Sequence, residues 1–257
     1  MQGLMIYSQE DIEKNREFSD WVRDEFKKYQ VELKVLAKEE LYSCEHSFKQ
    51  CAFVINRSRD YNLSLLLELN KIRVYNNSQI TLLGNNKLAG YAYVQKKGYP
   101  IARIVLPEES EQEKIISKPI YGHGGQGISV LGSIKEWKKD HVNQILLEDI
   151  VGDIRFYIIG NQVQTAVLRK AKEGVLSNFS LGGTVEQFYV DKEVNRYITS
   201  FMEGLSIDYA GIDFLLTKEG KFIFNEIEDV AGSRMLSQLA INNLVPIWVN
   251  HIIRELK

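Results

Sequence analysis

The amino-acid sequence predicts an α/β fold in its first part and an α+β fold in the rest. In residues 1–83, short apolar runs alternate with segments of helical period, which is typical of a parallel sheet covered by helices. After residue 100, apolar runs follow one another across turn residues, as in antiparallel hairpins. The 257 residues are enough for two or three compact units.

The composition is that of an ordinary globular protein. Hydrophobic residues make up 44% of the chain and charged residues 26%, and the formal net charge is -2. A balanced charge gives no electrostatic footprint for nucleic acid or an anionic membrane, so we expect neither as a partner. The chain has only two cysteines and its N-terminus shows no signal peptide, so we expect a cytoplasmic protein, with a homo-oligomer as an option.

One apolar segment approaches the length of a membrane span. Residues 235–253 contain no Lys, Arg, Asp or Glu. They do contain Pro246, His251 and several Asn and Gln residues, so we expect a packed pair of terminal helices and no span.

The first part has elements in strand–helix order. Strands are predicted at 3–8, 31–37, 52–56 and 71–76, and helices at 11–29 and 61–70. In the first helix, apolar residues recur at helical spacing: Phe18, Trp21, Val22, Phe26 and Tyr29. This order predicts a small parallel sheet with covered faces.

The rest of the chain is predicted to be richer in hairpins. A helix at 84–97 comes first, and strands follow at 101–106, 114–119, 128–131, 145–149, 153–160 and 162–171, with a short helix at 133–140. A helix at 191–205, a hairpin of 209–217 with 221–229, and a helical C-terminus complete the chain. We expect three parts, at 1–83, 84–147 and 148–257.

The clearest local motif is a glycine-rich loop between two apolar runs, KPIYGHGGQGISV, which begins at Lys118. Its glycines fit G-x-G-x-x-G, but a strand follows the loop, whereas a dinucleotide-binding fingerprint needs a helix. A strand–loop–strand flap can fold its backbone amides over phosphates. A protein kinase is excluded because H-R-D and D-F-G are absent. A merely flexible hairpin stays open as the alternative.

Two lysines could meet phosphate oxygens near this flap. Lys118 lies on the incoming strand, and Lys87 lies at the start of a predicted helix near a domain junction. Taken singly, each lysine fits a solvated surface residue better than a phosphate ligand.

The C-terminal hairpin carries three carboxylates. If Glu219 and Gly220 form its tight turn, Asp213 lies opposite Glu226, with Cβ atoms about 4.5–5.5 Å apart. Glu228 then shares the face of Glu226, roughly 6.6 Å along the strand. The patch would also contain three apolar residues, Leu215, Phe222 and Phe224.

Carboxylates placed this close repel one another, and magnesium would resolve the repulsion. An exposed acidic strand end, or Arg234 pairing with one acid, is the alternative.

Taken in order, these segments resemble the ATP-grasp superfamily, and more narrowly the RimK-like glutamate ligases. The resemblance covers nearly the whole chain and is clearest from Asn76 to Arg234. The matching pieces are Asn86-Lys87, Lys118 with its glycine loop, Leu147-Glu148-Asp149-Ile150, Gly152-Asp153-Ile154-Arg155, Arg169 to Gly174, Ser177-Asn178 with Gly182-Gly183, Gly211-Ile212-Asp213 and Asn225-Glu226-Ile227-Glu228. Each piece is weak alone, but eight in the right order are specific.

The resemblance implies an ATP-grasp fold with a small N-terminal Rossmann-like (pre-ATP-grasp) domain. The second part would be the small ATP-grasp subdomain with the flap, and the third would carry the metal-binding hairpin. It also implies an ATP-dependent carboxylate–amine ligase that forms an acyl phosphate and releases ADP and phosphate. The substrate would be a small amino acid or a peptide.

The resemblance also implies roles for single residues. ATP would be bound by Lys87, Lys118, Gly124, Gly125, Gln126, Gly127, Glu148, Asp149, Ile150, Asp153 and Asn178, with the backbone of 148–150 reading adenine and Asp153 near the ribose. Arg169 would be catalytic, facing the transferring phosphoryl group, and Arg155 and Arg234 would bind substrate. Asp213, Glu226 and Glu228 would hold two magnesium ions, or manganese.

Two departures from the family pattern matter. Glu228 stands where the family usually has Asn, and the loops on the substrate side are short, so glutamate specificity is not carried over. A ligase that modifies or cyclises a ribosomal peptide is one alternative function. A non-catalytic ATP-binding module is another, although the acid set and Arg169 argue against it.

Overall fold

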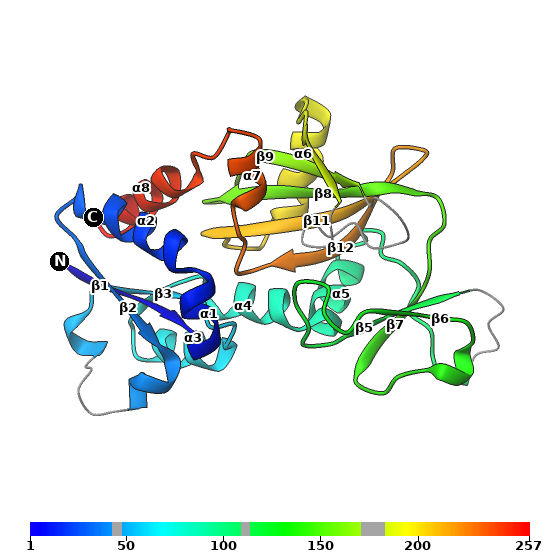
Figure 1. Cartoon of the computed structure of the whole chain (residues 1–257), viewed down its shortest axis with the longest axis horizontal. Coiled ribbons are helices and arrows are strands. Elements are labelled where there is room, and N and C mark those ends of the chain that lie inside the picture. The colour runs from blue at the N-terminus through cyan, green and yellow to red at the C-terminus, as the bar shows by residue number, and fades with distance from the viewer. Residues whose placement is uncertain (43–47, 109–113, 171–182) are drawn as a thin grey trace.

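The computed structural model describes residues 1–42, 48–108, 114–170 and 183–257, which form three sheets (Figure 1). The N-terminal sheet is parallel and has the order β2-β1-β3-β4. Its strands are β1 Gln2–Tyr7, β2 Glu32–Ala37, β3 Phe53–Asn56 and β4 Arg73–Tyr75. The predicted parallel sheet is therefore confirmed, and the strand order reverses at β1.

Helices cover both faces of this sheet. The helices are α1 Gln9–Lys14, α2 Arg16–Lys27 and α3 Tyr61–Leu69. The single helix predicted at 11–29 is wrong, because the chain breaks at Asn15. The Asn15 side chain donates to the carbonyl of Asp11 at 2.7 Å, which competes with continuation of the helix.

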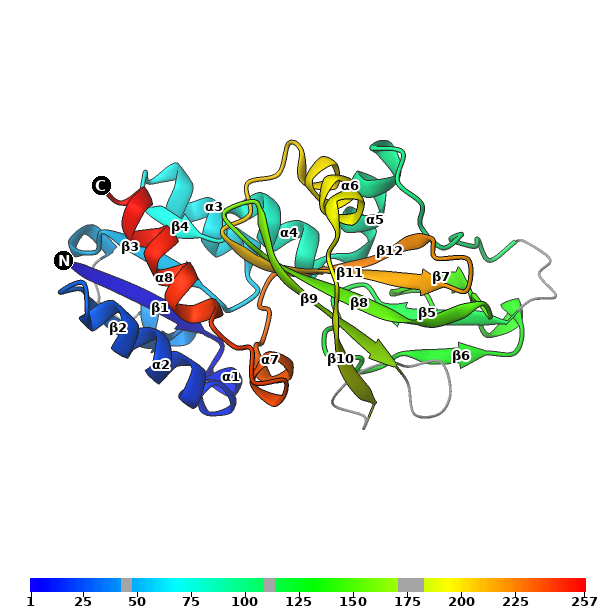
Figure 2. The same ribbon diagram turned by 90° about the horizontal axis from the view of Figure 1, so that it is seen from above.

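The C-terminal helices pack back onto the N-terminal end of the molecule. They are α7 Arg234–Gln238 and α8 Leu244–Glu255. Trp248 and Ile252 of α8 share one buried cluster with Phe26 of α2 and Tyr209 of the large sheet. The packed terminal helix pair is thus confirmed, and both termini lie at this end (Figures 1 and 2). Within the described residues no helix is long and apolar enough to cross a membrane.

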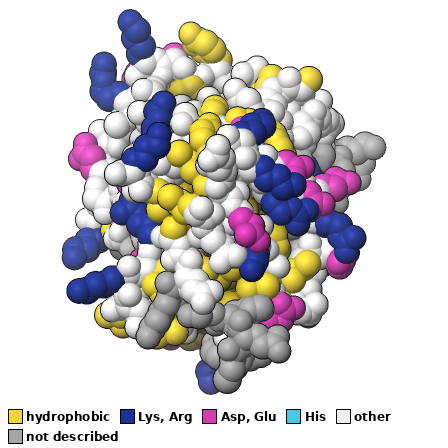
Figure 3. All heavy atoms as spheres, turned by 90° about the vertical axis from the view of Figure 1, so that its left-hand side faces the viewer, with side chains coloured by type: hydrophobic (Ala, Val, Ile, Leu, Met, Phe, Trp, Pro, Cys, Tyr) yellow, Lys and Arg dark blue, Asp and Glu magenta, His cyan; other side chains and the backbone are white. Residues whose placement is uncertain are grey.

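The face at this end carries basic side chains singly or in small groups, with acidic and hydrophobic side chains between them (Figure 3). Among the described side chains of this face, no extended patch of one charge is seen.

The linking helices are α4 Ser78–Asn85 and α5 Lys87–Lys96. One helix was expected at 84–97, but Asn86 ends α4 and caps α5, accepting from the Ala89 amide at 3.1 Å. This cap makes Lys87 the first residue of α5.

The small sheet is antiparallel, with the order β6-β5-β7. Its strands are β5 Ile115–Pro119, β6 Ser129–Leu131 and β7 His141–Ile145. The strand predicted at 145–149 is wrong because β7 ends at Ile145. The polar residues of β7 obscure the alternation of apolar and polar residues by which a strand is predicted. The strand predicted at 101–106 makes only isolated bridges at Ile101 and Ile104, and the helix predicted at 133–140 is a short turn, η3 Ile134–Glu136.

The large sheet is antiparallel, with the order β10-β9-β8-β11-β12. Its strands are β8 Ile150–Ile159, β9 Gln162–Lys170, β10 Thr184–Phe188, β11 Tyr209–Thr217 and β12 Phe222–Glu228, and β10 was not predicted. Successive side chains along each strand point to opposite faces of this sheet. Ile154, Phe156 and Phe214 pack in a core with α5 and with α6 Lys192–Met202. Their neighbours Arg155 and Asp213 therefore lie on the opposite face, which forms the site.

Candidate functional site

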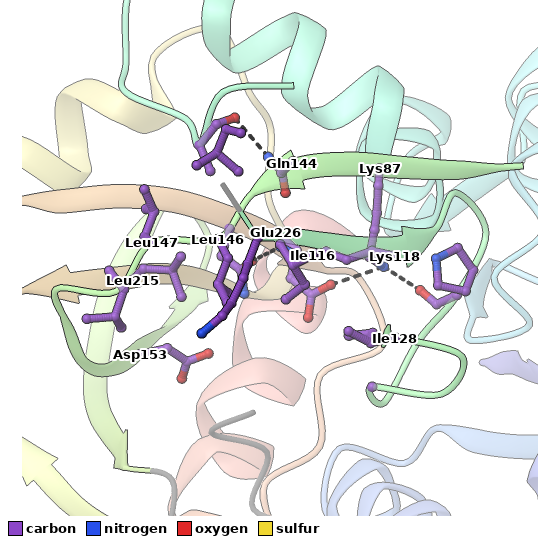
Figure 4. A pocket seen from close by; sticks show the side chains of 18 of the residues that line it. Lys87, Ile116, Lys118, Ile128, Gln144, Leu146, Leu147, Asp153, Leu215 and Glu226 are labelled. Carbon is purple, nitrogen blue, oxygen red and sulfur yellow. Dashed lines mark hydrogen bonds and ion pairs between the residues drawn. The ribbon is translucent and has the colours of Figure 1, made fainter. Parts of the chain in front are cut away.

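A cavity of about 480 Å³ lies between the small sheet and the large sheet (Figure 4). Its volume is in the usual range for small-molecule sites. One end is apolar and is lined by Ala102, Ile116, Leu146, Leu147, Ile150 and Leu215. The other end is polar and is lined by Lys87, Lys118, Asn225, Glu226 and the glycine loop. Such a gradient suits a ligand with a flat apolar ring at one end and anionic groups at the other.

Lys118 of β5 is buried in the wall of the polar end, with 7% of its surface exposed. Its ammonium donates to Asn225 Oδ1 at 2.8 Å and to the Tyr91 hydroxyl at 3.2 Å. Burial lowers the pKa of Lys118 to about 8, although the charges of Glu226 and Asp153 oppose the shift. None of its direct partners carries a full charge, so this lysine is suited to an anionic ligand.

Lys87 also lines the polar end, from the first position of α5. Its ammonium lies 3.2 Å from Glu226 Oε2 and also donates to the carbonyl of Gly122. Lys87 therefore connects the helix, the glycine loop and β12 across the cavity (Figure 4).

The glycine loop lies between β5 and β6, as predicted, with Gly125 and Gln126 lining the cavity. Gly124, Gly125 and Gly127 all have positive φ, at 63°, 77° and 71°. A Cβ on Gly127 would lie 2.8 Å from Pro119 Cγ, so only glycine fits there. Within the described residues, the amides of these three glycines have no hydrogen-bond partner. They are available to an anion.

The linking segment after β7 borders the apolar end. Glu148 and Ile150 line the cavity, with the Glu148 carboxylate exposed and 3.7 Å from Lys114 Nζ. The third predicted residue of this segment, Asp149, is not among the lining residues, and its carbonyl accepts from the Lys218 amide at 2.8 Å.

A row of alternating charges runs across the site face of the large sheet. Asp213 is fully buried and accepts from Arg155 at 2.8 and 2.7 Å and from Arg169. Arg169 also donates to both oxygens of Asp153, and Arg155 reaches Glu228 Oε2 at 3.2 Å. The row therefore alternates in sign from β8 and β9 to β12.

Burial and pairing set the charge states of this row in opposite directions. Burial disfavours the charge on Asp213, but Arg155 and Arg169 outweigh it and lower its pKa. Burial raises the pKa of Asp153 to about 6, against the effect of Arg169. Burial also raises the pKa of Glu228, against the effect of Arg155. Asp213 is thus the most firmly ionised of the three carboxyl groups.

The pairing of Asp213 with Glu226 is confirmed, although the turn differs from the predicted one. Leu216 pairs with Phe222 and Phe214 with Phe224, one position away from the predicted register. A register shift between Asp213 and Phe214, with Asn225 as the extra residue, restores the pairing.

The same shift overturns part of the predicted patch. Leu215 lines the cavity as expected, but Phe222 and Phe224 pack on the core face with Phe214.

The acidic residues offer oxygen, the donor that magnesium prefers. Glu226 lines the cavity, whereas both oxygens of Asp213 accept from arginines. Among the described residues, no group of three or more acidic, His or Cys side chains is placed to hold a metal ion. The geometry therefore fits an ion shared between Glu226 and ligand phosphates better than three protein carboxylates, and the three-residue assignment stays a prediction.

The remaining predicted residues lie in different environments. Arg155 is buried in its ion pairs, whereas Arg234 is exposed at the start of α7. Arg169 is buried behind its two carboxylates and is not among the lining residues of the cavity. Asn178 lies outside the described residues.

Sequence reasoning missed several residues of the site. Asn225 and Tyr91 hold Lys118, and Gln144 and His123 line the cavity. Asn225 could have been found, because it precedes Glu226 in the quoted motif. Gln144 and Tyr91 carry no local sequence signal, since they reach the site only through strand pairing and helix packing.

Comparisons with known proteins agree on one family. Residues 110–247 match the RimK-like ATP-grasp domain. The tetrahydromethanopterin:alpha-L-glutamate ligase of Methanocaldococcus jannaschii is 23% identical over 96% of this chain and 97% of its own length.

Solved structures show the ATP-grasp fold. The ATP-grasp ligase PsnB, complexed with a phosphomimetic variant of a minimal precursor, Mg and ADP, superposes with a TM-score of 0.74 at 17% identity, covering 99% of this chain and 98% of its own. The D-alanine–D-alanine ligase of Bacillus anthracis, complexed with ATP, also has a TM-score of 0.74, at 14% identity and with 99% and 96% covered.

The first prediction concerns the charge row. Asp213→Asn leaves two buried arginines short of a counter-charge, so the free energy of unfolding should fall by about 3 kcal/mol or more in urea titrations. The control is Glu186→Gln, which removes the charge from an exposed cross-strand pair with Lys170 in the same sheet. That change should cost less than about 1 kcal/mol. Equal, small losses in both variants would contradict a stabilising role for Asp213.

Proposed function

This chain belongs to the RimK-like ATP-grasp family of carbon–nitrogen ligases, and we propose that it joins a carboxylate to an amine through an acyl phosphate, releasing ADP and phosphate. The observation that carries the proposal is the polarity of the cavity. An apolar end leads to two lysines and a loop of free glycine amides.

The nucleotide would lie between the second and third parts of the chain as divided above. Its base would occupy the apolar end beside the segment 148–150, and its ribose would approach Asp153. Lys118 and Lys87 would bind phosphate oxygens, and the amides of Gly124, Gly125 and Gly127 would close over them. To bind phosphate, Lys87 would have to give up its ion pair with Glu226. Nucleotide binding would therefore be coupled to the position of Glu226 on β12.

The chemistry has two steps. A substrate carboxylate oxygen attacks the γ-phosphorus, and ADP leaves. An amine nitrogen then attacks the acyl carbon, loses a proton, and phosphate leaves. Asp153 and Asp213 hold the Arg169 guanidinium in one orientation, which would preorganise it for the negative charge that develops in both steps. Burial opposes its charge, but those carboxylates raise its pKa, so Arg169 stays cationic.

Magnesium, when bound, would neutralise phosphate charge during the transfer. Glu226 would hold it from the cavity wall, with Asp213 and Glu228 as further proposed ligands. Two ions, or manganese in their place, belong to the same proposal.

The substrates would enter from the N-terminal sheet. Asp11 and Arg59 form an ion pair beyond the carboxyl ends of β1 and β3, where the strand order reverses. Ligands of open α/β sheets bind at such reversals. The positive charge of Arg59 lowers the pKa of Glu228 and that of His123, which lies in the glycine loop. This effect supports a position of Arg59 that faces the site. We propose an amino acid or a peptide as substrate, with exposed Arg234 as a further contact.

The second prediction tests the acyl phosphate directly. Hydroxylamine should replace the unknown amine, so ATP, magnesium and the correct carboxylate should give a hydroxamate and one ADP. Oxygen-18 in the carboxylate should appear in the released phosphate. Free amino acids and short peptides form the test set, and mass spectrometry is the readout. Release of AMP and pyrophosphate, or phosphate without the label, would overturn the mechanism.

The third prediction compares two glutamates of one hairpin. Glu226→Gln should lower turnover at least about a hundredfold, roughly 3 kcal/mol, because it removes a cavity carboxylate with little change of shape. Glu219→Gln lies in the exposed turn and should leave turnover unchanged. Magnesium should also raise nucleotide affinity less in Glu226→Gln than in wild type. Identical magnesium titrations for the two variants would remove Glu226 from the metal site.

The fourth prediction concerns the pH dependence of nucleotide binding. Lys118 has a pKa lowered to about 8, so its ammonium is lost as pH rises through that value. Binding of ATP needs the cation, so affinity measured by calorimetry should fall between about pH 7 and 9, with proton uptake on binding. Lys118→Arg keeps its charge over this range and should remove that pH dependence. A parallel decline in the two proteins would assign the effect to another group.

A further inference from the structure

Asp229 is a buried carboxylate that the proposed reaction does not use. It follows directly after β12 and is 3% exposed. Its Oδ1 accepts a hydrogen bond from Asn76 Nδ2 at 2.8 Å, and its Oδ2 accepts one from Asn85 Nδ2 at 2.9 Å. Both partners are neutral amides. A carboxylate buried against neutral partners is costly, so its presence calls for a further reason.

The orientations of both amides are fixed by main-chain groups. Asn76 Oδ1 accepts from the amides of Asp208 and Tyr209 at 3.1 and 2.9 Å. Its nitrogen must therefore face Asp229. Asn85 Nδ2 also donates to a main-chain carbonyl of α4 at 2.8 Å, which can only accept. Asp229 thus meets two N–H donors, and although burial raises its pKa, only the ionised form accepts with both oxygens.

The two partners of Asp229 lie at the two ends of α4. Asn76 lies two residues before the helix begins at Ser78, and Asn85 is its last residue. Next to Asn85, Gly84 packs against Asp229 itself, because a Cβ on this glycine would lie 2.8 Å from Asp229 Cβ. One carboxylate therefore holds both ends of α4 against the end of β12.

Helix α4 connects the N-terminal sheet to α5, beside the cavity (Figure 1). Before the helix, Asn76 donates at 2.7 Å to a carbonyl at the start of β11, which ties the chain after β4 to the large sheet. After the helix, Asn86 caps α5 and so sets the place of Lys87. Lys87 lies 3.2 Å from Glu226, which is three residues before Asp229 in the chain. Asp229 thus holds the lysine through α4 and the glutamate through β12.

We infer that Asp229 is a positioning residue that keeps Lys87 and Glu226 at a fixed spacing at the phosphate end of the cavity. The inference rests on the proposed function, in which both side chains act on the same phosphates. Asp229 is not among the residues that line the cavity, so it acts through the helix and the strand. A displacement of about 1 Å in such a pair can lower a rate about a hundredfold.

The test measures how far Lys87 and Glu226 depend on each other in nucleotide binding, and it needs no knowledge of the substrates. ATP is titrated calorimetrically with magnesium into wild type, Lys87→Met, Glu226→Gln and the double variant. The loss of ATP affinity caused by Glu226→Gln should differ at least about fivefold between the wild-type and the Lys87→Met backgrounds. Neighbouring residues that act on one ligand are coupled in this way.

In Asp229→Asn, the same coupling should fall to about twofold or less. The substitution keeps the shape, but an amide accepts on one side only, so an N–H of Asn76 or Asn85 is left facing another donor. That contact should separate α4 from β12. Turnover with hydroxylamine should fall at least about tenfold, whereas ATP affinity should change less than about threefold, because the positions of the two side chains matter more for the transfer than for binding.

Asp208→Asn is the matched control. Asp208 is also a buried carboxyl group at the junction with the large sheet, 9% exposed, but it contacts His251 Nε2 at 3.0 Å and is not among the residues of the cavity. The same substitution there should keep the coupling, whatever its effect on the melting temperature. Asn85→Ala serves as a second variant if Asp229→Asn does not fold, since Asn85 is half-buried, and it should lower the coupling in the same direction.

The outcomes separate the inference from the proposed function. Coupling that survives Asp229→Asn, or wild type without coupling, overturns the inference and leaves the ligase proposal standing. Coupling lost equally in Asp208→Asn would assign the effect to lowered stability and likewise overturn the inference. Release of AMP in the hydroxylamine experiment would overturn the ligase proposal and leave the role of Asp229 in the nucleotide site intact. Wild type that binds no ATP overturns both.

Discussion

The burial of Asp213 between Arg155 and Arg169 is the interaction on which the site depends. A carboxylate with no exposed surface is costly to bury, and the two guanidinium groups offset that cost only with close hydrogen bonds. Strands β8, β9 and β11 each contribute to the arrangement. A slip of one residue in any of these strands would turn a charge into the core that α5 and α6 cover. The charge row therefore helps to fix the register of the sheet that carries the site.

The same row sets the charge balance of the cavity. Four carboxylates, Asp153, Asp213, Glu226 and Glu228, face four cations, Lys87, Lys118, Arg155 and Arg169. A nucleotide polyphosphate brings several negative charges into a site that is already near neutrality. Closer approach then needs further positive charge, which argues for magnesium even though Asp213 is committed to arginines. The need for metal follows from the balance of charge, independently of a cluster of three carboxylates.

Sequence reasoning succeeded where pattern and chemistry are local. The strands of the parallel sheet and the glycine loop follow from short segments. The pairing of Asp213 with Glu226 was predicted from a different turn, and the extra residue Asn225 restores it. Sequence reasoning failed where the position of a side chain is set by a contact with a residue far away in the sequence. The polar residues of β7 do not have the period of a buried strand, yet Gln144 and Asn143 find acceptors in neighbouring segments. Asn225 is the extra residue of its strand, and its side chain accepts from Lys118, 107 residues away in the sequence.

Arg155 and Glu228 show how one substitution changes the roles of its neighbours. The family usually has a neutral Asn where this chain has Glu228, so the chain carries one more carboxyl group, whose side chain is 18% exposed. Arg155 Nη2 lies 3.2 Å from Glu228 Oε2, and its positive charge compensates that carboxylate. Gly211 makes room for it, because a Cβ there would lie 3.0 Å from Arg155 Cδ. Glu228 and Arg155 are therefore better understood as partners of each other than as a free metal ligand and a free substrate contact. Of the three predicted metal ligands, this leaves Glu226 as the one that lines the cavity.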